Sequence, residues 1–234
     1  IQLLINSEWC ENFLSRIPPY LVNEKNHGKQ ILYPKFNKVE YRFKKIVEFL
    51  ISCFLIILSS PIIIFAAFLI YTEDQGPIFY SQIRKGIHGK NFRIFKLRTM
   101  KIDSEKDGIQ WSSKNDPRIT KIGRFLRKTR IDELPQLISV ILGEMSLIGP
   151  RPERPEIDFY LQKSIPYYES RYSITPGITG WAQVNYPYGS SMEDSFNKLS
   201  YDLYYLRNFS IILDLLILFK TIRVVLDYRN ASSK

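Results

Sequence analysis

The stretch FLISCFLIILSSPIIIFAAFLIY, residues 49–71, decides the fold of this chain. It contains no charged residue, and as a helix rising about 1.5 Å per residue it would reach roughly 34 Å, enough to cross a bilayer. A run of this length without charge is uncommon in the buried helix of a soluble core. The stretch therefore predicts a membrane helix.

The middle of this stretch predicts a bend. Pro61 removes a helical hydrogen bond and kinks a helix. Ser59 and Ser60 precede it, and their hydroxyls are suited to bond the carbonyls that the bend frees. Two arrangements stay open: a helix that spans the membrane, and a re-entrant helix that turns at Ser60-Pro61 and returns to the same face.

The charges on the two flanks bear on this choice. Basic residues mark the cytoplasmic side of a membrane helix. Both flanks carry them, at positions 35, 38, 42, 44 and 45 before the run and 84, 85, 90, 93, 96, 98 and 101 after it. A re-entrant helix places both flanks on one side, whereas a spanning helix separates them.

Composition narrows the classes of partner. The chain of 234 residues has a formal net charge of +10 and a pI of about 9.5, which suits nucleic acid, an anionic membrane or a phosphorylated substrate. The sequence has no zinc-finger spacing and no RNA-binding aromatic signature, so nucleic acid is not an expected partner. Cys10 and Cys53 are too few for a disulfide framework. Because the chain starts at Ile1 and not Met, we expect a fragment or a processed chain.

A basic segment follows the apolar run. Residues 77–100 predict two short strands joined by a turn that holds Gly86 and Gly89. Residues 84–130 contain fifteen Lys and Arg against four acidic residues. This density predicts a phosphate site together with a contact to lipid headgroups. Residues 121–130 predict a basic amphipathic helix suited to an anionic membrane surface.

The segment RIDELPQL, residues 130–137, holds two adjacent carboxylates, Asp132 and Glu133. Pro135 fits the first turn of a helix, which places Asp132 near the N-cap. The pair is then either a cap and a partner of the helix dipole, or a catalytic pair. Successive helix residues diverge by about 100°, which favours divided roles. One carboxylate would attack a phosphorus atom and the other would hold Mg²⁺.

Two loops complete the candidate site. In MSLIGPRPERPEI, residues 145–157, Arg151 stands between two prolines and is either a bidentate phosphate clamp or part of a surface turn. In TPGITGWAQVN, residues 175–185, Gly177 and Gly180 predict a tight turn. Trp181 is expected under a planar base, at a lipid interface or in the core.

In combination, these segments resemble the bacterial sugar transferases, the monotopic phosphoglycosyl transferases that prime polysaccharide and glycoconjugate synthesis. The resemblance covers roughly residues 41–226. The matching segments are LSSP, GPIFYSQIRKGIHGKNFRIFKLRTM, DELPQL, GEMSLIGPRPERPE, TPGITGWAQVN and DLYYLRNFSIILDLLILFKTI. Residues 186–189, Tyr-Pro-Tyr-Gly, depart from the small members and resemble the catalytic part of large ones.

The resemblance implies an activity. The enzyme would transfer a sugar 1-phosphate from a UDP-sugar to polyprenyl (undecaprenyl) phosphate by a ping-pong mechanism and release UMP. Asp132 would form a phosphosugar-aspartyl intermediate, and Glu133 would help to hold Mg²⁺. The implied phosphate-binding residues are Arg127, Arg151, Arg98 and Lys96.

The resemblance also implies an architecture. We expect an α+β, mainly helical, monotopic protein of the bacterial inner membrane, with a re-entrant helix broken at Ser60-Pro61 and an active site that faces the cytoplasm. A small β-hairpin and interfacial amphipathic helices, one at residues 209–226, complete it. A homo-oligomer is compatible with this expectation. The expected parts are an extension or linker (1–40), the membrane helix (41–73), the catalytic domain (74–228) and a tail (229–234).

Two other functions fit the residues. A membrane-bound phosphohydrolase of nucleotide sugars would use the same aspartate with water as the acceptor. A membrane-surface adaptor without catalysis would use only the basic face, and Asp132→Asn would then leave its function unchanged. No segment of the sequence identifies the sugar.

Overall fold

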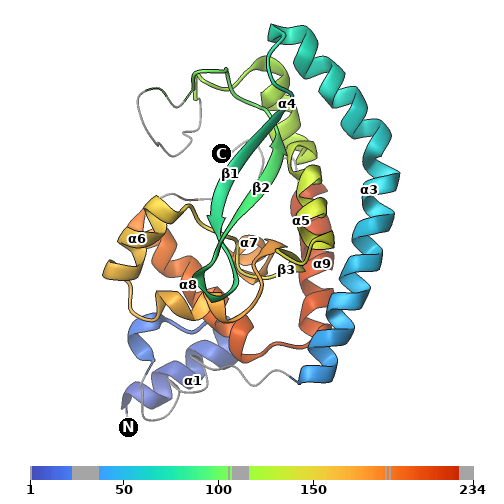
Figure 1. The fold of residues 1–234 in the computed structure, drawn as a ribbon. Helices are drawn as coiled ribbons and strands as arrows, with labels where there is room; N and C mark the ends of the chain where they lie inside the picture. Colours follow the sequence, from blue (N-terminus) through green and yellow to red (C-terminus); the bar gives the residue numbers. More distant parts are fainter. Residues whose placement is uncertain are drawn as a thin grey trace.

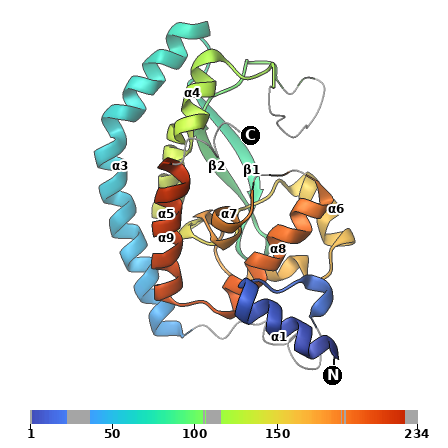
Figure 2. The ribbon, with the colours of Figure 1, turned by 180° about the vertical axis from the view of Figure 1, so that it is seen from behind.

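The computed structural model describes residues 2–22, 37–104, 106, 116–187, 189 and 191–226. Its described part is mainly helical with two small two-stranded sheets, which confirms the predicted α+β class. A long helix runs along one side of the molecule and shorter helices lie against it (Figures 1 and 2). The long helix is α3 (Lys38–Asp74), and the shorter ones are α4 (Lys121–Thr129), α5 (Leu137–Ile141) and α9 (Ile211–Leu226).

The helix α3 is bent, with Pro61 inside it (Figure 1). Among the described residues it is the one helix long and apolar enough to cross a membrane. Ser60 Oγ donates to the carbonyl of Ile57 at 2.8 Å, the carbonyl whose usual amide partner Pro61 lacks. Ser59 Oγ bonds Leu55 O at 2.7 Å. The predicted bond to a freed carbonyl is confirmed for Ser60, whereas the carbonyl that Ser59 bonds is not one that Pro61 frees.

The polarity of α3 is inverted relative to a helix on the surface of a soluble protein. Its outward face exposes large apolar side chains, among them Phe54, Ile57 and Ile64. Its inward face buries Lys44 and Glu48 against the rest of the chain. An apolar outer face and a polar inner face are what a lipid environment selects.

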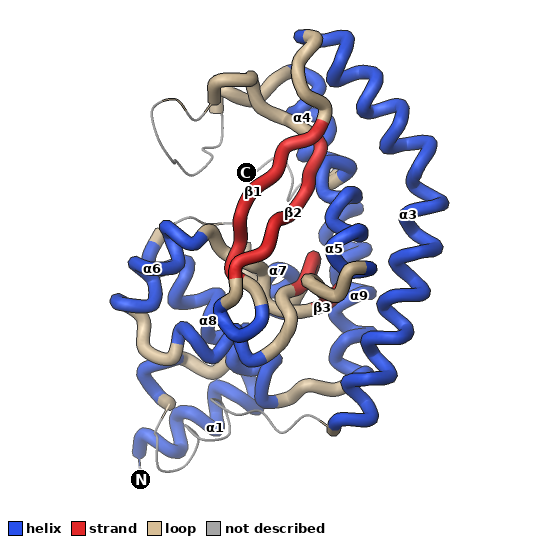
Figure 3. Tube along the Cα trace, viewed as in Figure 1, coloured by secondary structure: helices blue, strands red, loops and turns tan. Residues whose placement is uncertain are grey.

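The β-hairpin is the first small sheet (Figure 3). Strand β1 (Phe79–Lys85) pairs antiparallel with β2 (Asn91–Leu97) through a 3₁₀ turn, η3 (Ile87–Gly89). The predicted hairpin and its turn are therefore confirmed. In the register of the pair Tyr80 lies opposite Lys96, so both belong to the same face.

The second sheet corrects a prediction. Strand β3 (Ser146–Ile148) pairs parallel with β4 (Gly177–Thr179), so the predicted tight turn between Gly177 and Gly180 is wrong. A Cβ on Gly177 or on Gly180 would overlap with the backbone of Gly149, and this close approach explains both glycines.

Helices at the other end of the molecule surround the main core. They are α1 (Gln2–Leu14), η1 (Pro19–Leu21), α6 (Pro155–Ser164), η5 (Tyr168–Ser173), α7 (Trp181–Asn185) and α8 (Met192–Arg207). Figure 1 shows α1 and α6 away from α3, whereas the C-terminal turn of α8 reaches it through Tyr205. Trp181 is buried and stacks on Tyr204, which settles its position in favour of the core.

The segment before the membrane helix is partly a packed element. Ile17 is buried and its N–H donates to Ser200 O on α8 at 2.8 Å. Trp181 Nε1 donates to Ser15 O at 2.8 Å. The predicted linker at residues 1–40 thus includes a part that packs on α7 and α8. Residues 23–36 lie outside the described residues, as does the predicted tail at 229–234.

Two predicted amphipathic helices form. The prediction at residues 121–130 corresponds to α4, which buries Leu126 and exposes Phe125 beside Arg124 and Lys128. The prediction at residues 209–226 corresponds to α9, whose outer face exposes Ile212, Leu215, Phe219 and Ile222.

Candidate functional site

The carboxylate pair lies in a 3₁₀ helix, η4 (Ile131–Gln136), and not at the start of an α-helix. Arg130, in the left-handed conformation at φ 60°, ends α4 and leads directly into η4. The predicted N-cap role of Asp132 is therefore wrong, because this residue lies inside the 3₁₀ turn. The α-helix α5 begins only at Leu137, after Pro135.

Asp132 is buried without full compensation. The residue is only 7% exposed, and its side-chain oxygen Oδ1 has no hydrogen-bond partner among the described residues. Burial and the neighbouring Glu133 carboxylate raise the pKa of Asp132 to about 6, against the opposing charges of Lys96 and Arg127. A buried oxygen without a hydrogen-bond partner is typical of a catalytic group or of a group that binds an ion or a ligand.

Glu133 has the opposite environment. Its Oε1 accepts hydrogen bonds from Lys96 Nζ at 2.8 Å and Arg151 Nη2 at 2.5 Å, and Arg130 Nη1 lies 3.9 Å away. Burial disfavours its charge, but these three cations outweigh burial and hold the pKa of Glu133 well below its usual value. The two carboxylates thus have pKa values pushed apart, which is typical of divided catalytic roles.

The cations predicted to bind phosphate have different partners. Lys96 and Arg151 meet at Glu133, as described. Arg127 Nε donates to Thr99 Oγ1 at 2.8 Å, and its charge acts on Asp132.

Arg98 lies in a different setting. Its guanidinium clasps Asp74, and its Nε donates to Pro77 O at 2.5 Å. These contacts join the hairpin to the end of α3. They favour a structural role for Arg98, and its phosphate-binding role stays a prediction.

Sequence reasoning missed the residues that brace this site. Arg130 is one, although its spacing of three from Glu133 was a usable signal. Arg171 is another: its Nη2 donates to Arg151 O at 2.8 Å and to Asp202 Oδ2 at 2.9 Å. Because Arg171 and Asp202 are 31 positions apart, nothing local in the sequence indicates this pair.

The carboxylates of Asp132 and Glu133 also determine what kind of metal site is possible. The described residues contain no group of three or more His, Cys, Asp or Glu side chains that could hold a metal ion. Mg²⁺ is often bound by one or two carboxylates, with waters and substrate phosphates as its other ligands. The unpaired Oδ1 of Asp132 and the adjacent Glu133 fit that pattern. Dependence on Mg²⁺ is a prediction.

Comparison with known proteins identifies the family. The model of the family described as "Bacterial sugar transferase" matches residues 39–228. The chain belongs to this family. The match begins at the first turn of α3, so α1 and η1 lie outside the part that the family shares.

Relatives with described activities are similar over most of this chain. It is 44% identical over 183 residues, 78% of its length and 43% of the relative's, to the UDP-N-acetylgalactosamine-undecaprenyl-phosphate N-acetylgalactosaminephosphotransferase of Aeromonas hydrophila. It is 38% identical over 188 residues, 80% of its length and 40% of the relative's, to a UDP-glucose:undecaprenyl-phosphate glucose-1-phosphate transferase of Klebsiella pneumoniae.

A relative named for the same reaction in Caulobacter vibrioides is 37% identical over 190 residues, 80% of this chain and 71% of the relative. The chain thus spans about two fifths of the length of the first two relatives.

Proposed function

We propose that this protein transfers a sugar 1-phosphate from a UDP-sugar to polyprenyl phosphate and releases UMP, as the initiating step of polysaccharide or glycoconjugate synthesis. The buried, unpaired Asp132 Oδ1 beside the anionic Glu133 carries the proposal. The names of the three relatives described above, which are undecaprenyl-phosphate sugar phosphotransferases, support it.

The chemistry proceeds in two displacements. In the first, an oxygen of ionised Asp132 bonds to the β-phosphorus of the donor, the bond from that phosphorus to the bridging oxygen breaks, and UMP leaves with the electron pair. In the second, a phosphate oxygen of the lipid attacks the same phosphorus and Asp132 departs as a carboxylate. Splitting the transfer in this way is what a covalent nucleophile contributes.

The surrounding cations stabilise the charge. Lys96 and Arg151 hold Glu133 in place and, together with Arg127, would stabilise the charge of a bound diphosphate. Mg²⁺, when bound, would be held with the help of Glu133 and would neutralise diphosphate charge.

The membrane arrangement belongs to the same proposal. The bend at Pro61 would let α3 enter and leave through one face, an arrangement that the basic residues on both of its flanks support. The exposed apolar side chains of α3 and α9 would contact lipid, and the active site would face the cytoplasm.

The test is UMP release from a panel of UDP-sugars in detergent, with Mg²⁺ or EDTA and with or without polyprenyl phosphate. We expect sustained release from one or a few sugars that needs both the acceptor and Mg²⁺. Release that continues without the acceptor would indicate a phosphohydrolase. No release from any sugar would contradict the transferase assignment and leave a membrane-surface adaptor.

The pH profile is a second prediction. Since the ionised form of Asp132 attacks, and its pKa is raised to about 6, kcat/KM should fall as pH drops through 6. Below that pH the decline should approach about tenfold per unit, as for one titrating base. Loss of Arg127, whose charge lowers this pKa, should move the decline to higher pH. An unchanged rate down to pH 5 would contradict the role of Asp132.

The bend in α3 gives a third prediction. A proline inside a helix costs about 3 kcal/mol. The substitution Pro61→Leu removes this cost, because it restores the missing hydrogen bond and removes the kink. We expect the variant to span the membrane, so that its two flanks lie on opposite sides. The measurement uses two variants, Lys38→Cys and Lys101→Cys, in a protein without Cys10 and Cys53. Labelling with a membrane-impermeant reagent then shows on which side of the membrane each flank lies. Ile62→Leu is the control, and equal labelling of both sites in Pro61→Leu would contradict the expectation.

A further inference from the structure

A second group of buried charges lies where the first turns of α3 meet β3. Lys44 and Glu48 are each 5% exposed. A charge buried on a helix with an apolar outer face is costly unless it is paired and hydrogen-bonded. The partners of these two residues therefore indicate what the helix holds in place.

Glu48 accepts hydrogen bonds from strand β3. Ser146 Oγ lies 2.6 Å from both of its oxygens, and Oε1 also accepts from the N–H groups of Leu147 at 3.1 Å and Ile148 at 3.3 Å. One side chain of α3 thus bonds three donors on three consecutive residues of the strand. Such a set fixes both the position and the direction of β3.

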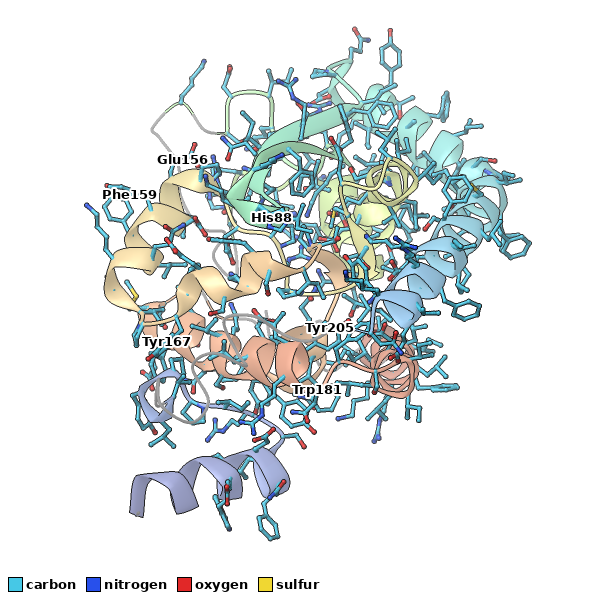
Figure 4. The ribbon with its side chains drawn as sticks, turned by 60° about the horizontal axis from the view of Figure 1, so that its bottom comes forward. His88, Glu156, Phe159, Tyr167, Trp181 and Tyr205 are labelled. Carbon is cyan, nitrogen blue, oxygen red and sulfur yellow. The ribbon has the colours of Figure 1, made fainter. Side chains whose placement is uncertain are left out.

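Lys44 completes the junction. Its Nζ lies 3.6 Å from Glu48 Oε1 and donates to Ile148 O at 2.9 Å, to Tyr205 OH at 2.9 Å and to Asp214 Oδ2 at 2.8 Å. Tyr205 on α8, labelled in Figure 4, donates to Asp214 Oδ1 at 2.7 Å. The junction therefore ties α3 to β3, α8 and α9 at once.

The path from β3 to the carboxylate pair is short. Only Gly149 and Pro150 separate Ile148 from Arg151. Both are held: Gly149 N bonds Thr179 O and Gly177 N bonds Pro150 O, each at 2.9 Å. Arg151 then donates to Glu133 at 2.5 Å. A shift of β3 along this path must move the guanidinium relative to Glu133.

We propose that Glu48 is a positioning residue for the active site: by fixing β3 it places Arg151 against Glu133. The membrane helix is then part of the catalytic framework as well as an anchor. The inference rests on the proposed function, because it assigns a catalytic consequence to a contact between α3 and β3.

The test compares three variants. Glu48→Ala removes every acceptor and should lower kcat/KM about 10²-fold, the scale expected when a catalytic group is displaced by about 1 Å. Glu48→Gln keeps an oxygen for the two amides and should restore most of the rate. Ser52→Ala is the matched control one turn along the same face, because Ser52 is buried and its hydroxyl has no hydrogen-bond partner within the described chain. Its rate should equal that of wild type.

A double-mutant cycle with Arg151→Ala tests the route. If Glu48 acts through Arg151, adding Glu48→Ala to Arg151→Ala should cost little more than Arg151→Ala alone. Losses that multiply would overturn the proposal. So would an unchanged rate in Glu48→Ala, or a loss in Glu48→Gln as large as in Glu48→Ala.

Hydrogen exchange separates this inference from the transferase assignment. Exchange of peptides covering residues 145–151 should rise in Glu48→Ala and not in Ser52→Ala. If wild type transfers no sugar phosphate while exchange rises as expected, the transferase assignment fails and the hold on β3 is supported. If exchange in Glu48→Ala equals that of wild type, the hold itself is refuted, whatever the activity.

Discussion

Asp132→Asn is expected to abolish sugar 1-phosphate transfer and at the same time to stabilise the protein. The amide cannot form the acyl phosphate, and loss of a nucleophile costs about 10⁴- to 10⁶-fold in rate. A raised folded-state pKa of about 6, against 3.8, means that the folded protein binds more protons than the unfolded chain between these values. Stability therefore falls as pH rises through this window.

The size of the stability change follows from the same shift. At pH 7.5 the ionised Asp132 costs about 2–3 kcal/mol, because each unit of pKa is worth about 1.4 kcal/mol. The asparagine variant should melt at a higher temperature than wild type at pH 7.5, and the difference should disappear below about pH 4. Thermal unfolding in detergent at both pH values, beside UMP release, measures both effects.

Glu156→Gln is the control for Asp132→Asn. Glu156 is an exposed carboxylate in the first turn of α6, labelled in Figure 4. Its replacement should change neither rate nor melting temperature. A transfer rate of Asp132→Asn within tenfold of wild type would refute the assignment of Asp132 as the nucleophile. A melting temperature of Asp132→Asn below that of wild type at pH 7.5 would refute the claim that ionised Asp132 destabilises the folded protein.

Arg151→Ala is expected to lower kcat/KM by about 10²- to 10³-fold, or about 3–4 kcal/mol, the usual loss when a preorganised charge stabiliser is removed. Arg151 is the cation that lowers the pKa of Glu133 most, so its loss should raise that pKa. Arg151→Lys should recover little, because a lysine cannot reproduce the planar fork of the guanidinium. Steady-state kinetics on the best donor measure all three proteins.

Arg93→Lys is the matched control for Arg151. Arg93 is exposed on β2 and belongs to the opposite strand face from Lys96, three positions away. Its replacement should leave kcat/KM unchanged. A value of kcat/KM for Arg151→Ala within threefold of wild type would contradict the prediction. It would show that Lys96 and Arg130 are enough to position Glu133.

The elements that sequence reasoning predicted well depend on local signals. The hairpin follows from strand patterns on both sides of Gly86 and Gly89, and α4 and α9 follow from apolar periodicity. The bend in α3 follows from one proline and the serine before it. In each case the deciding residues lie within one or two turns of each other, so the sequence alone contains the information.

The features that were wrong or missed depend on distant residues. The prediction of a turn at Gly177 failed because Gly149, 28 positions earlier, requires a close backbone approach. Asp132 has no N-cap role because the left-handed Arg130 leads the chain into a 3₁₀ helix. The setting of Arg98 is determined by Asp74, 24 positions away.

The junction of α3 with the rest of the chain also has a consequence for biosynthesis. Glu48 precedes its partner Ser146 by 98 residues, and Lys44 precedes Asp214 by 170. At about 5–20 residues per second, the ribosome completes α3 roughly 4–28 s before it reaches these partners. During that time Lys44 and Glu48, which lie 3.6 Å apart on the helix, have each other as partners but lack those on β3, α8 and α9. We therefore expect the packing of the first turns of α3 against β3, α8 and α9 to be a late step, which follows the synthesis of those elements.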